Sequence, residues 1–135
     1  MKFYSRKLIK PGDLNANNTL FGGALLRWID EEAGIYAMSN LDTQRVVTKY
    51  VSEIDFISSA KQGEVIEIGL ELLSVGTTSI TFACLVRNIF SKKEILSIDK
   101  IVFVQVDEAE KAMPHGKTFE GICATSKKLK SEITE

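Results

Sequence analysis

Hydrophobic residues recur along the chain with two different periods, and each period predicts a different kind of element. Residues 22 to 39 are mostly strong helix formers or bulky apolar residues, which predicts one long helix. Apolar residues lie on nearly every side of this helix, so we expect it to be covered all round. Gly34 weakens a helix relative to alanine, and we expect the close approach of another backbone at that position.

From residue 44 to residue 107 the pattern becomes an alternation, which predicts four strand segments. Turn-like separators at residues 61–63, 75–77 and 91–93 are short, so neighbouring strands should be antiparallel. Alternate residues from Val46 to Phe56 are expected to share one face of the first segment. In the last segment the expected face is Leu96, Ile98, Val102 and Val104, with Lys100 as an interruption.

The last two segments are also apolar on their opposite face, where the residues are Ala83, Leu85, Ile89, Ile101 and Phe103. A sheet that is apolar on both sides needs a second cover, and we expect a partner subunit to supply it. Residues 2 to 10 are predicted to form an edge strand. The tail beyond Pro114, with Lys127, Lys128 and Lys130, is predicted to form a short polar helix. The fold class is therefore α+β, an antiparallel sheet wrapped around one helix, in a single domain over residues 1–135.

Charge and composition exclude several classes of protein. Seventeen Lys and Arg against eighteen Asp and Glu give a net charge of −1, which provides no footprint for nucleic acid or an anionic membrane surface. The sequence has no apolar run of membrane-spanning length and no signal-peptide pattern. Two cysteines without metal-ligand spacing argue against a disulfide framework and a zinc site. We expect a cytoplasmic protein without a cofactor.

Asp30 is the first candidate for chemistry. Its neighbours on one side of the predicted helix are Leu26, Ala33, Gly34 and Ala37, which form an apolar stripe. A carboxylate among apolar groups is harder to ionise, so its pKa rises and it becomes a better proton acceptor. The alternative interpretation is that Asp30 belongs to a solvated acidic patch on the helix surface.

A second candidate precedes the helix, where Asn15 and Asn17 are followed by Gly22 and Gly23. The first backbone N–H groups of a helix lack intrahelical partners and can hold an oxyanion, and glycine lets a ligand come close to them. The alternative is an ordinary asparagine turn followed by a glycine loop. His115 is interpreted as an exposed tail histidine, and no Gly-x-Ser-x-Gly motif supports a serine hydrolase.

Taken together, these residues resemble a known signature. Asn15-Ala16-Asn17, Phe21-Gly22-Gly23 and the following helix with Asp30 are similar to hotdog-fold acyl-CoA thioesterases, in the YciA-type and cytosolic acyl-CoA hydrolase branch. The stretches 46–48, 55–57, 63–65 and 75–80 resemble the same branch, in the same order. The resemblance implies a sheet wrapped around a central helix and a homodimer, often assembled into a trimer of dimers.

The resemblance also implies roles for individual residues. Asp30 matches the general base or nucleophile. Asn15 matches a catalytic asparagine contributed across the dimer, with Asn17 as the second choice. Gly23, with Gly22 beside it, matches the backbone donor to the thioester oxygen. A further set matches the segment that lines the pantetheine path: Gly76, Thr78 and Ser79.

The function implied is hydrolysis of acyl-CoA to free fatty acid and coenzyme A. Phe21 stands where some relatives have His or Asn, which argues against a histidine-based mechanism. A hotdog dehydratase is disfavoured because such enzymes generally use a histidine in the site, and His115 is badly placed for that role. The alternative from another class is a non-catalytic acyl-CoA-binding or sensing module on the same fold. The preferred acyl chain length cannot be read from the sequence.

Overall fold

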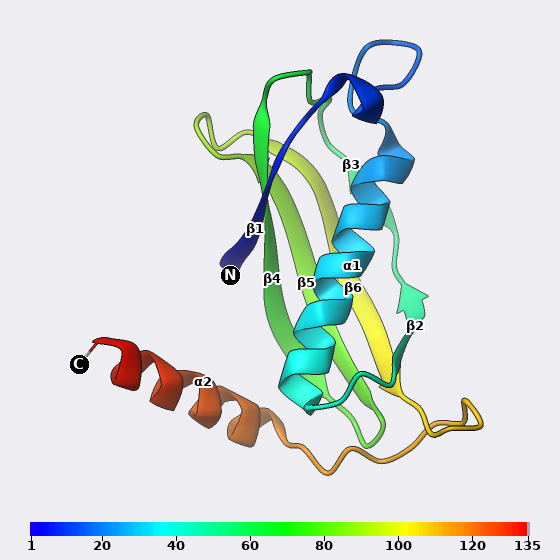
Figure 1. The fold of residues 1–135 in the computed structure, drawn as a ribbon, viewed down its shortest axis with the longest axis vertical. Coiled ribbons are helices and arrows are strands. Elements are labelled where there is room, and N and C mark those ends of the chain that lie inside the picture. The colour runs from blue at the N-terminus through cyan, green and yellow to red at the C-terminus, as the bar shows by residue number, and fades with distance from the viewer. Residues whose placement is uncertain (135) are drawn as a thin grey trace.

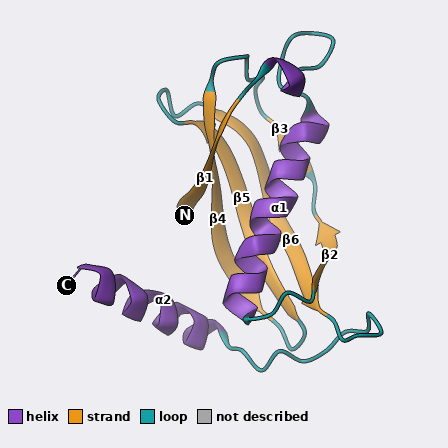
Figure 2. Ribbon diagram, in the orientation of Figure 1, coloured by secondary structure: helices purple, strands orange, loops and turns teal. Residues whose placement is uncertain are grey.

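The structure is a computed structural model that describes residues 1–134, with side chains described as far as residue 127. Strands form an antiparallel sheet that curves around helix α1, and a second helix, α2, leaves one end of this body (Figures 1 and 2). The strand order is β1-β4-β5-β6-β2, and β3 also pairs with β6. The elements are β1 (Lys2–Leu8), the 3-10 turn η1 (Pro11–Asp13), α1 (Gly22–Leu41), β2 (Val46–Val51), β3 (Ile54–Phe56), β4 (Val65–Val75), β5 (Ser79–Asn88), β6 (Glu94–Gln105) and α2 (Phe119–Thr134).

The main elements follow the prediction from the sequence. The long helix is present and ends at Leu41, and β1 lies at one edge of the sheet. A helix also occupies the tail, although the side chains of Lys128 and Lys130 lie outside the described residues. The α+β arrangement expected from the periodicity is therefore confirmed.

The core lies between α1 and the concave face of the sheet. In β5 every second residue is buried, as the alternation predicts, because successive side chains of a strand point to opposite faces. In β4 the five residues 66–70 are all buried, so both faces of that stretch are covered. The helix contributes residues spaced three and four apart, so that one of its sides faces the sheet. The buried helix residues are Leu25, Trp28, Ile29, Ala33, Gly34, Ala37 and Leu41. One helix and one curved sheet thus enclose the core.

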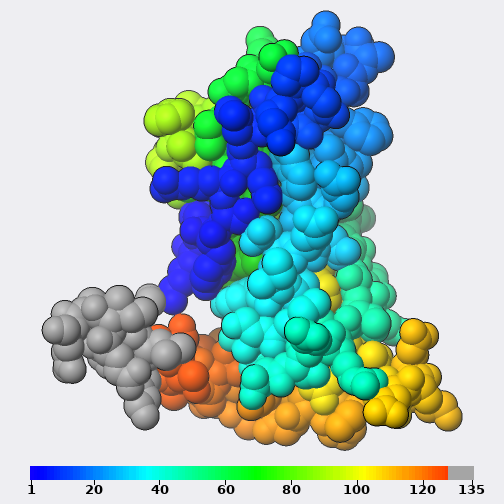
Figure 3. Space-filling model, in the orientation of Figure 1, coloured from blue at the N-terminus to red at the C-terminus, as the bar shows by residue number. Residues whose placement is uncertain are grey.

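The opposite side of α1 is uncovered, which corrects the expectation that the helix is covered all round. Arg27, Glu31 and Ile35, spaced four residues apart, are exposed, and Ile35 keeps 58% of its surface accessible. Figure 3 shows the outer side of α1 open to solvent on the face in view. Among the described residues on this side of α1, Ile35 is therefore the large apolar side chain that is left open to solvent.

The first predicted strand is divided in two and contains a bulge. Thr48 pairs with Phe103 and Tyr50 pairs with Val102, so Lys49 is an extra residue. Directly opposed residues share a face, and a bulge reverses the alternation that follows it. Tyr50 therefore faces away from α1, and the expectation that it shares a face with Val46 and Thr48 is wrong.

A second bulge corrects the predicted face of β6. Phe82 pairs with Ile101 and Cys84 with Ile98, so two residues of β6, at positions 99 and 100, stand opposite one residue of β5. Beyond the bulge Ile101 and Phe103 are buried in the core, whereas Val102 and Val104 lie on the outer face. The sequence pattern had assigned these two pairs to the reverse faces. The predicted interruption of the alternation at Lys100 coincides with the bulge. The alternation along one strand does not show that the faces of the following residues are reversed.

Gly34 does not face another backbone. A Cβ atom placed there would lie 3.7 Å from the ring of Phe103, which is an ordinary van der Waals contact. The predicted close approach of two backbones is therefore wrong. The neighbour of the glycine is an aromatic side chain in the core.

The two cysteine thiols are expected to differ in reactivity. Burial raises the pKa of the Cys84 thiol to about 12, so almost none of it is thiolate at neutral pH. Cys123 is only half-buried. Because the thiolate is the reactive form, iodoacetamide at pH 7.5 should label Cys123 in the native protein and label Cys84 only after denaturation. Peptide mass spectrometry measures this, and labelling of native Cys84 at the rate of Cys123 would contradict it.

Candidate active site

The loop before α1 is organised by the side chain of Asn15. Its Oδ1 accepts hydrogen bonds from the backbone N–H of Asn17 (2.9 Å) and from both the N–H and the hydroxyl of Thr19 (3.2 Å each). This is the asparagine turn that the sequence left open as an alternative. Among residues 1–134 the Nδ2 group of Asn15 has no hydrogen-bond partner, so it remains available as a donor. The turn and a role in chemistry are therefore compatible, since they use different atoms of one amide.

A cavity of about 420 Å³ brings Asn15 and Gly22 together. Its other walls come from the end of β3, the residues after it, and the neighbouring strand. They include Phe56, Ile57 and Ser58. Two of the predicted site residues thus share a cavity at the start of α1, whereas Gly23 and Asn17 do not line it.

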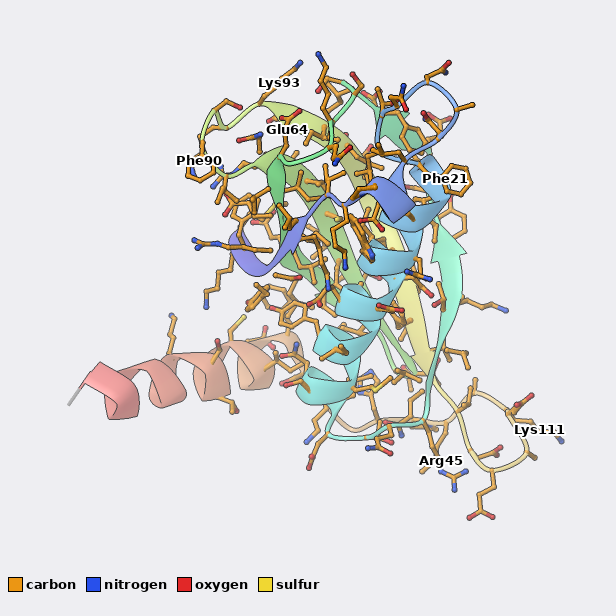
Figure 4. All side chains as sticks on the ribbon, turned by 45° about the horizontal axis from the view of Figure 1, so that its top comes forward. Phe21, Arg45, Glu64, Phe90, Lys93 and Lys111 are labelled. Carbon is orange, nitrogen blue, oxygen red and sulfur yellow. The ribbon has the colours of Figure 1, made fainter. Side chains whose placement is uncertain are left out.

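The two glycines at the start of α1 lie against aromatic rings. A Cβ atom on Gly23 would lie 2.7 Å from the ring of Phe21, and one on Gly22 would lie 3.3 Å from the ring of Phe56. No side chain in the described chain caps the helix, which begins directly after Phe21. Figure 4 shows Phe21 at this end of α1, at the surface of the molecule. Packing against exposed rings is therefore one reason for the glycine pair, and a free helix N-terminus is its chemical consequence.

Asp30 lies on the flank of α1 that faces strand β2. Its Oδ1 accepts a hydrogen bond of 2.7 Å from the hydroxyl of Thr48. Ala33, Gly34 and Ala37 on the predicted apolar stripe are buried, but the Asp30 side chain itself is exposed. The expectation that this chain surrounds the carboxylate with apolar groups is wrong, because β2 is the edge of the sheet and no strand among residues 1–134 lies beyond it.

The chain alone does not bring Asp30 to the other candidates. Eight residues of helix separate Asp30 from Gly22, which is roughly 12 Å along the axis. Asp30 is not among the residues that line the cavity at Asn15. A single chain therefore holds the predicted carboxylate and the predicted asparagine in two separate places.

The third predicted segment lies at the other end of the helix. Gly76, Thr78 and Ser79 belong to the hairpin between β4 and β5, which lies at the end of the sheet where α1 ends (Figure 1). A Cβ atom on Gly76 would collide with the hydroxyl of Ser79 in its present position, so a larger residue here would have to displace that side chain. Within one chain this hairpin is remote from Asn15 and Gly22.

His115 fastens the tail to this hairpin, which corrects its interpretation as an exposed histidine. Its ring is half-buried, and Nδ1 accepts a hydrogen bond of 2.9 Å from the N–H of Lys117. Nε2, which then carries the proton, donates to the carbonyl of Ser79 at 3.0 Å. The backbone N–H of His115 also donates to the carbonyl of Thr77 at 3.1 Å. His115 therefore has a structural role, because its hydrogen bonds hold the segment after Pro114 against the hairpin between β4 and β5.

Another cavity, of about 720 Å³, is larger than the one at Asn15 and contains none of the predicted site residues. It lies between the second half of α1, strand β1 and the start of α2, and its walls include Tyr4, Tyr36, Asn40 and Ile122. These helix positions are on a different side of α1 from Asp30. Size alone therefore does not identify the active site.

No helix among residues 1–134 is long and apolar enough to cross a membrane. In the same residues no group of three or more His, Cys, Asp or Glu side chains is placed to hold a metal ion.

Comparison with known proteins identifies the family. The model of the thioesterase superfamily matches residues 17–92, which is more than half of the chain and includes Asp30 and all of α1. The chain belongs to the thioesterase superfamily. The resemblance stated from the sequence is thereby confirmed.

Individual members of the superfamily are similar over part of their length. An uncharacterized acyl-CoA thioester hydrolase from Buchnera aphidicola is 35% identical over 80 residues, which are 59% of this chain and 58% of that protein. The acyl-CoA thioester hydrolase YciA from Escherichia coli K12 is 34% identical over 76 residues, which are 56% and 57% of the two chains. The matched region thus spans less than two thirds of these relatives.

Solved structures of superfamily members agree over most of the chain. The hexameric thioesterase y2039 from Yersinia pestis has a TM-score of 0.76 and 28% identity, and covers 84% of this chain and 93% of its own. HI0827, a hexameric broad specificity acyl-coenzyme A thioesterase, has a TM-score of 0.75 and 26% identity, with coverage of 96% and 90%. The predicted hotdog fold is confirmed.

The contacts of two residues, Thr48 and His115, were not predicted from the sequence. Thr48 lies in the stretch 46–48 that resembles the family, but its contact with Asp30 depends on how α1 lies across the sheet and was not predicted. The role of His115 depends on the path of the tail past the hairpin. Only the preceding proline marked that position in the sequence.

Proposed function

We propose that this protein hydrolyses the thioester of acyl-CoA to a free fatty acid and coenzyme A. The observation that carries the proposal is the placement of Asp30, an exposed carboxylate fixed by a hydrogen bond to Thr48 at the open edge of the sheet. The names of the relatives, acyl-CoA thioester hydrolases, support the substrate class.

In the proposed reaction Asp30 acts as general base or as nucleophile. As a base, its carboxylate takes a proton from water while the water oxygen bonds to the thioester carbon, and the carbonyl oxygen becomes an oxyanion. The backbone N–H of Gly23, with Gly22 beside it, stabilises that oxyanion at the start of the helix. The carbon–sulfur bond then breaks, and the thiolate of coenzyme A takes the proton back from Asp30. These steps use no metal or other cofactor.

Asn15 is proposed to donate its free Nδ2 group to the thioester carbonyl or to the attacking water. Because its Oδ1 is held by Asn17 and Thr19, the amide is already oriented before substrate binds. In the chain alone this donor and the Asp30 carboxylate are separate. We therefore propose that each active site combines Asp30 of one subunit with Asn15 of the other.

The proposed homodimer forms along strand β2. This strand is an edge of the sheet, with unpaired backbone groups that another strand can bind. Large apolar side chains are exposed around it: Val47, Tyr50, Val51, Phe56 and Ile57. Pairing at this edge covers them and also places a second subunit beside Asp30.

The remaining candidates are proposed to bind the rest of the substrate. Asn17 is the alternative to Asn15, and Gly76, Thr78 and Ser79 are proposed to line the pantetheine path. The two solved thioesterases named above are hexameric, which supports a trimer of dimers for this protein as well. A cytoplasmic location, expected from the sequence, stays a prediction.

Release of thiol from a series of acyl-CoA substrates, from acetyl to palmitoyl, tests the proposed function. We expect catalytic turnover with at least one chain length. Coenzyme A should be quantified by chromatography, because Cys123 would itself react with a thiol reagent. Tight retention of acyl-CoA without release of coenzyme A would contradict hydrolysis and would support the non-catalytic binding module instead.

A further inference from the structure

Three successive backbone carbonyls of the hairpin between β4 and β5 are held by other segments of the chain. The Thr77 carbonyl accepts the backbone N–H of His115 at 3.1 Å, and the Thr78 carbonyl accepts the N–H of Gln105 at 2.8 Å. The Ser79 carbonyl accepts the Nε2–H of the His115 ring at 3.0 Å. His115 therefore supplies two of these contacts, one from its backbone and one from its ring.

The hydroxyl groups of the same hairpin remain available to a ligand. Among the described residues the hydroxyls of Thr77, Thr78 and Ser79 make no hydrogen bond, and Thr77 is exposed. A hydroxyl both donates and accepts, so a row of them suits the amide groups of a peptide-like chain. The pantetheine arm of coenzyme A is a chain of this kind. The position of the hairpin therefore decides where these hydroxyls can meet that arm.

The strand register places this hairpin near the part of β2 that contacts Asp30. Ser79 is directly opposite Val104, and Val104 is directly opposite Val47. Two strand spacings are about 10 Å, and Val47 precedes Thr48, whose hydroxyl binds Asp30. The hairpin between β5 and β6 lies at the opposite end of the sheet (Figure 1). A substrate arm that starts at Asp30 therefore has the β4–β5 hairpin within reach.

The ring of His115 is fixed from both sides. Its Nδ1 accepts the N–H of Lys117 at 2.9 Å, which leaves the ring proton on Nε2 for the bond to Ser79. Gly116 between them has a φ of 69°, a left-handed conformation that glycine adopts without strain. This turn brings the Lys117 N–H back to the ring. The tail thus presents one oriented donor to the hairpin.

We infer that His115 is a positioning residue for the substrate, because its ring holds the β4–β5 hairpin where the hairpin hydroxyls bind the pantetheine arm of acyl-CoA. This inference rests on the proposed function, since it assigns His115 a part in binding the substrate of that reaction. His115 acts through Ser79 and does not itself bond to the substrate. Its effect should therefore fall on substrates that carry the pantetheine arm.

The replacement His115→Ala tests the inference, because it removes the ring and keeps the backbone N–H that binds Thr77. A hydrogen bond between neutral groups corresponds to roughly a two- to tenfold change in an equilibrium constant. We expect the KM for acyl-CoA and the Kd of coenzyme A, measured by isothermal titration calorimetry, to rise by roughly three- to tenfold. We expect kcat to change by less than about twofold, because the loss affects substrate binding.

A truncated substrate separates positioning from a general loss of structure. An acyl thioester of N-acetylcysteamine keeps the reacting group and lacks the outer part of the pantetheine arm and the nucleotide. For this substrate kcat/KM of His115→Ala should stay within about twofold of wild type, since the hairpin contact is not used. If this thioester reacts too slowly to measure, the Kd of coenzyme A decides, and an unchanged Kd overturns the inference.

Two conservative replacements identify the ring atom that matters. Glutamine reaches as far as Nε2 and keeps a donor for Ser79, so His115→Gln should recover most of the low KM. Asparagine is shorter and keeps only an acceptor near Nδ1, so His115→Asn should behave like His115→Ala. Thermal unfolding shows whether each variant is folded. If His115→Ala does not fold, the comparison of His115→Gln with His115→Asn in the same assays decides the question.

Asn88→Ala is the matched control. The buried Asn88 holds the hairpin between β5 and β6, where its Oδ1 accepts the N–H groups of Phe90 at 2.8 Å and Ser91 at 3.1 Å. The variant loosens a hairpin at the other end of the sheet, and we expect it to leave the KM for acyl-CoA unchanged. A rise in KM as large as that of His115→Ala would overturn the inference.

The possible outcomes separate this inference from the proposed function. Wild-type KM for acyl-CoA in a folded His115→Ala variant, together with an inactive Asp30→Asn variant, would overturn the role of His115 and leave the hydrolase intact. An equal loss of kcat/KM on acyl-CoA and on the truncated thioester would also overturn it. If the wild-type protein releases no coenzyme A from any acyl-CoA, both proposals fail.

Discussion

Replacement of Asp30 by asparagine is expected to lower the rate of acyl-CoA hydrolysis by roughly 10²- to 10⁴-fold, the usual contribution of a positioned base. The side chain is exposed, so the change should alter the free energy of unfolding by less than about 0.5 kcal/mol. Steady-state rates and thermal unfolding of the same preparations measure both effects. Glu31→Gln, which neutralises the next residue on the exposed side of α1, is the matched control. Hydrolysis within a few-fold of wild type in Asp30→Asn would remove Asp30 from the mechanism.

Mixing two inactive variants tests whether the site is shared between subunits. Asp30→Ala and Asn15→Ala chains, unfolded and refolded together in equal amounts, should form mixed dimers in half of the population. One site of each mixed dimer then has both residues intact, so about a quarter of the wild-type activity should return. If Asp30 and Asn15 of one chain served the same site, no activity would return.

Replacement of Arg87 by methionine should have a large effect on stability. Glu67 is buried on β4, and the Nε of Arg87, directly opposite on β5, lies 2.6 Å from its Oε1. Lys92 Nζ lies 3.5 Å from the same oxygen, and the Arg87 guanidinium stacks 3.7 Å above the ring of Phe3. Removing one partner of a buried pair costs about 3–5 kcal/mol, and we expect about 2–3 here because Lys92 remains.

This loss of stability should depend on pH in a definite direction. Burial alone would raise the pKa of Glu67, but the bond to Arg87 and the charges of Lys92 and Arg87 outweigh it, so that the pKa is lowered. A carboxyl whose pKa is lowered in the folded state stabilises the protein above its unfolded-state pKa, near 4.3, and this contribution is lost as the pH falls through the folded value. The difference between wild type and Arg87→Met should therefore be largest at pH 7 and shrink below pH 4.

Urea unfolding of both proteins at several pH values measures this difference. Arg45→Met is the matched control, because Arg45 pairs with Glu108 at 3.5 Å where both side chains are largely exposed. Exposed pairs contribute about 1 kcal/mol or less, so the control should change stability little at any pH. An Arg87→Met penalty that is the same at pH 3 and pH 7 would show that the effect comes from packing on Phe3 and not from the charge of Glu67.

The parts of the fold that the sequence predicted are those where one period continues without interruption. The helix from Gly22 is of this kind, and so is the start of the last strand, where Leu96 and Ile98 are buried as predicted. The predictions failed where one extra residue shifts the phase, at Lys49 and at Lys100. A bulge depends on how two strands pair, and the alternation along one strand does not contain that information.

The surroundings of the candidate site residues also depend on contacts between elements that are distant in the sequence. Periodicity correctly placed Asp30 beside Ala33 and Ala37, but it does not reveal that this flank of the helix lies over the edge strand of the sheet. The contact with Thr48 joins elements 18 residues apart in the sequence and follows only from the packing of the helix on the sheet. The sequence therefore identifies Asp30 as a candidate site residue, but it does not predict which residues surround the Asp30 side chain in the fold.

The open edge at β2 also ties folding to association. A lone subunit in dilute solution would present a row of unsatisfied amides flanked by Val47 and Val51, which is the feature that templates intermolecular β-aggregation. A subunit that has formed the proposed dimer no longer exposes this edge and cannot aggregate through it. The proposed dimer contact would therefore complete the catalytic centre and also protect a newly made chain from aggregation. The affinity of this contact would set the lowest protein concentration at which the native form persists.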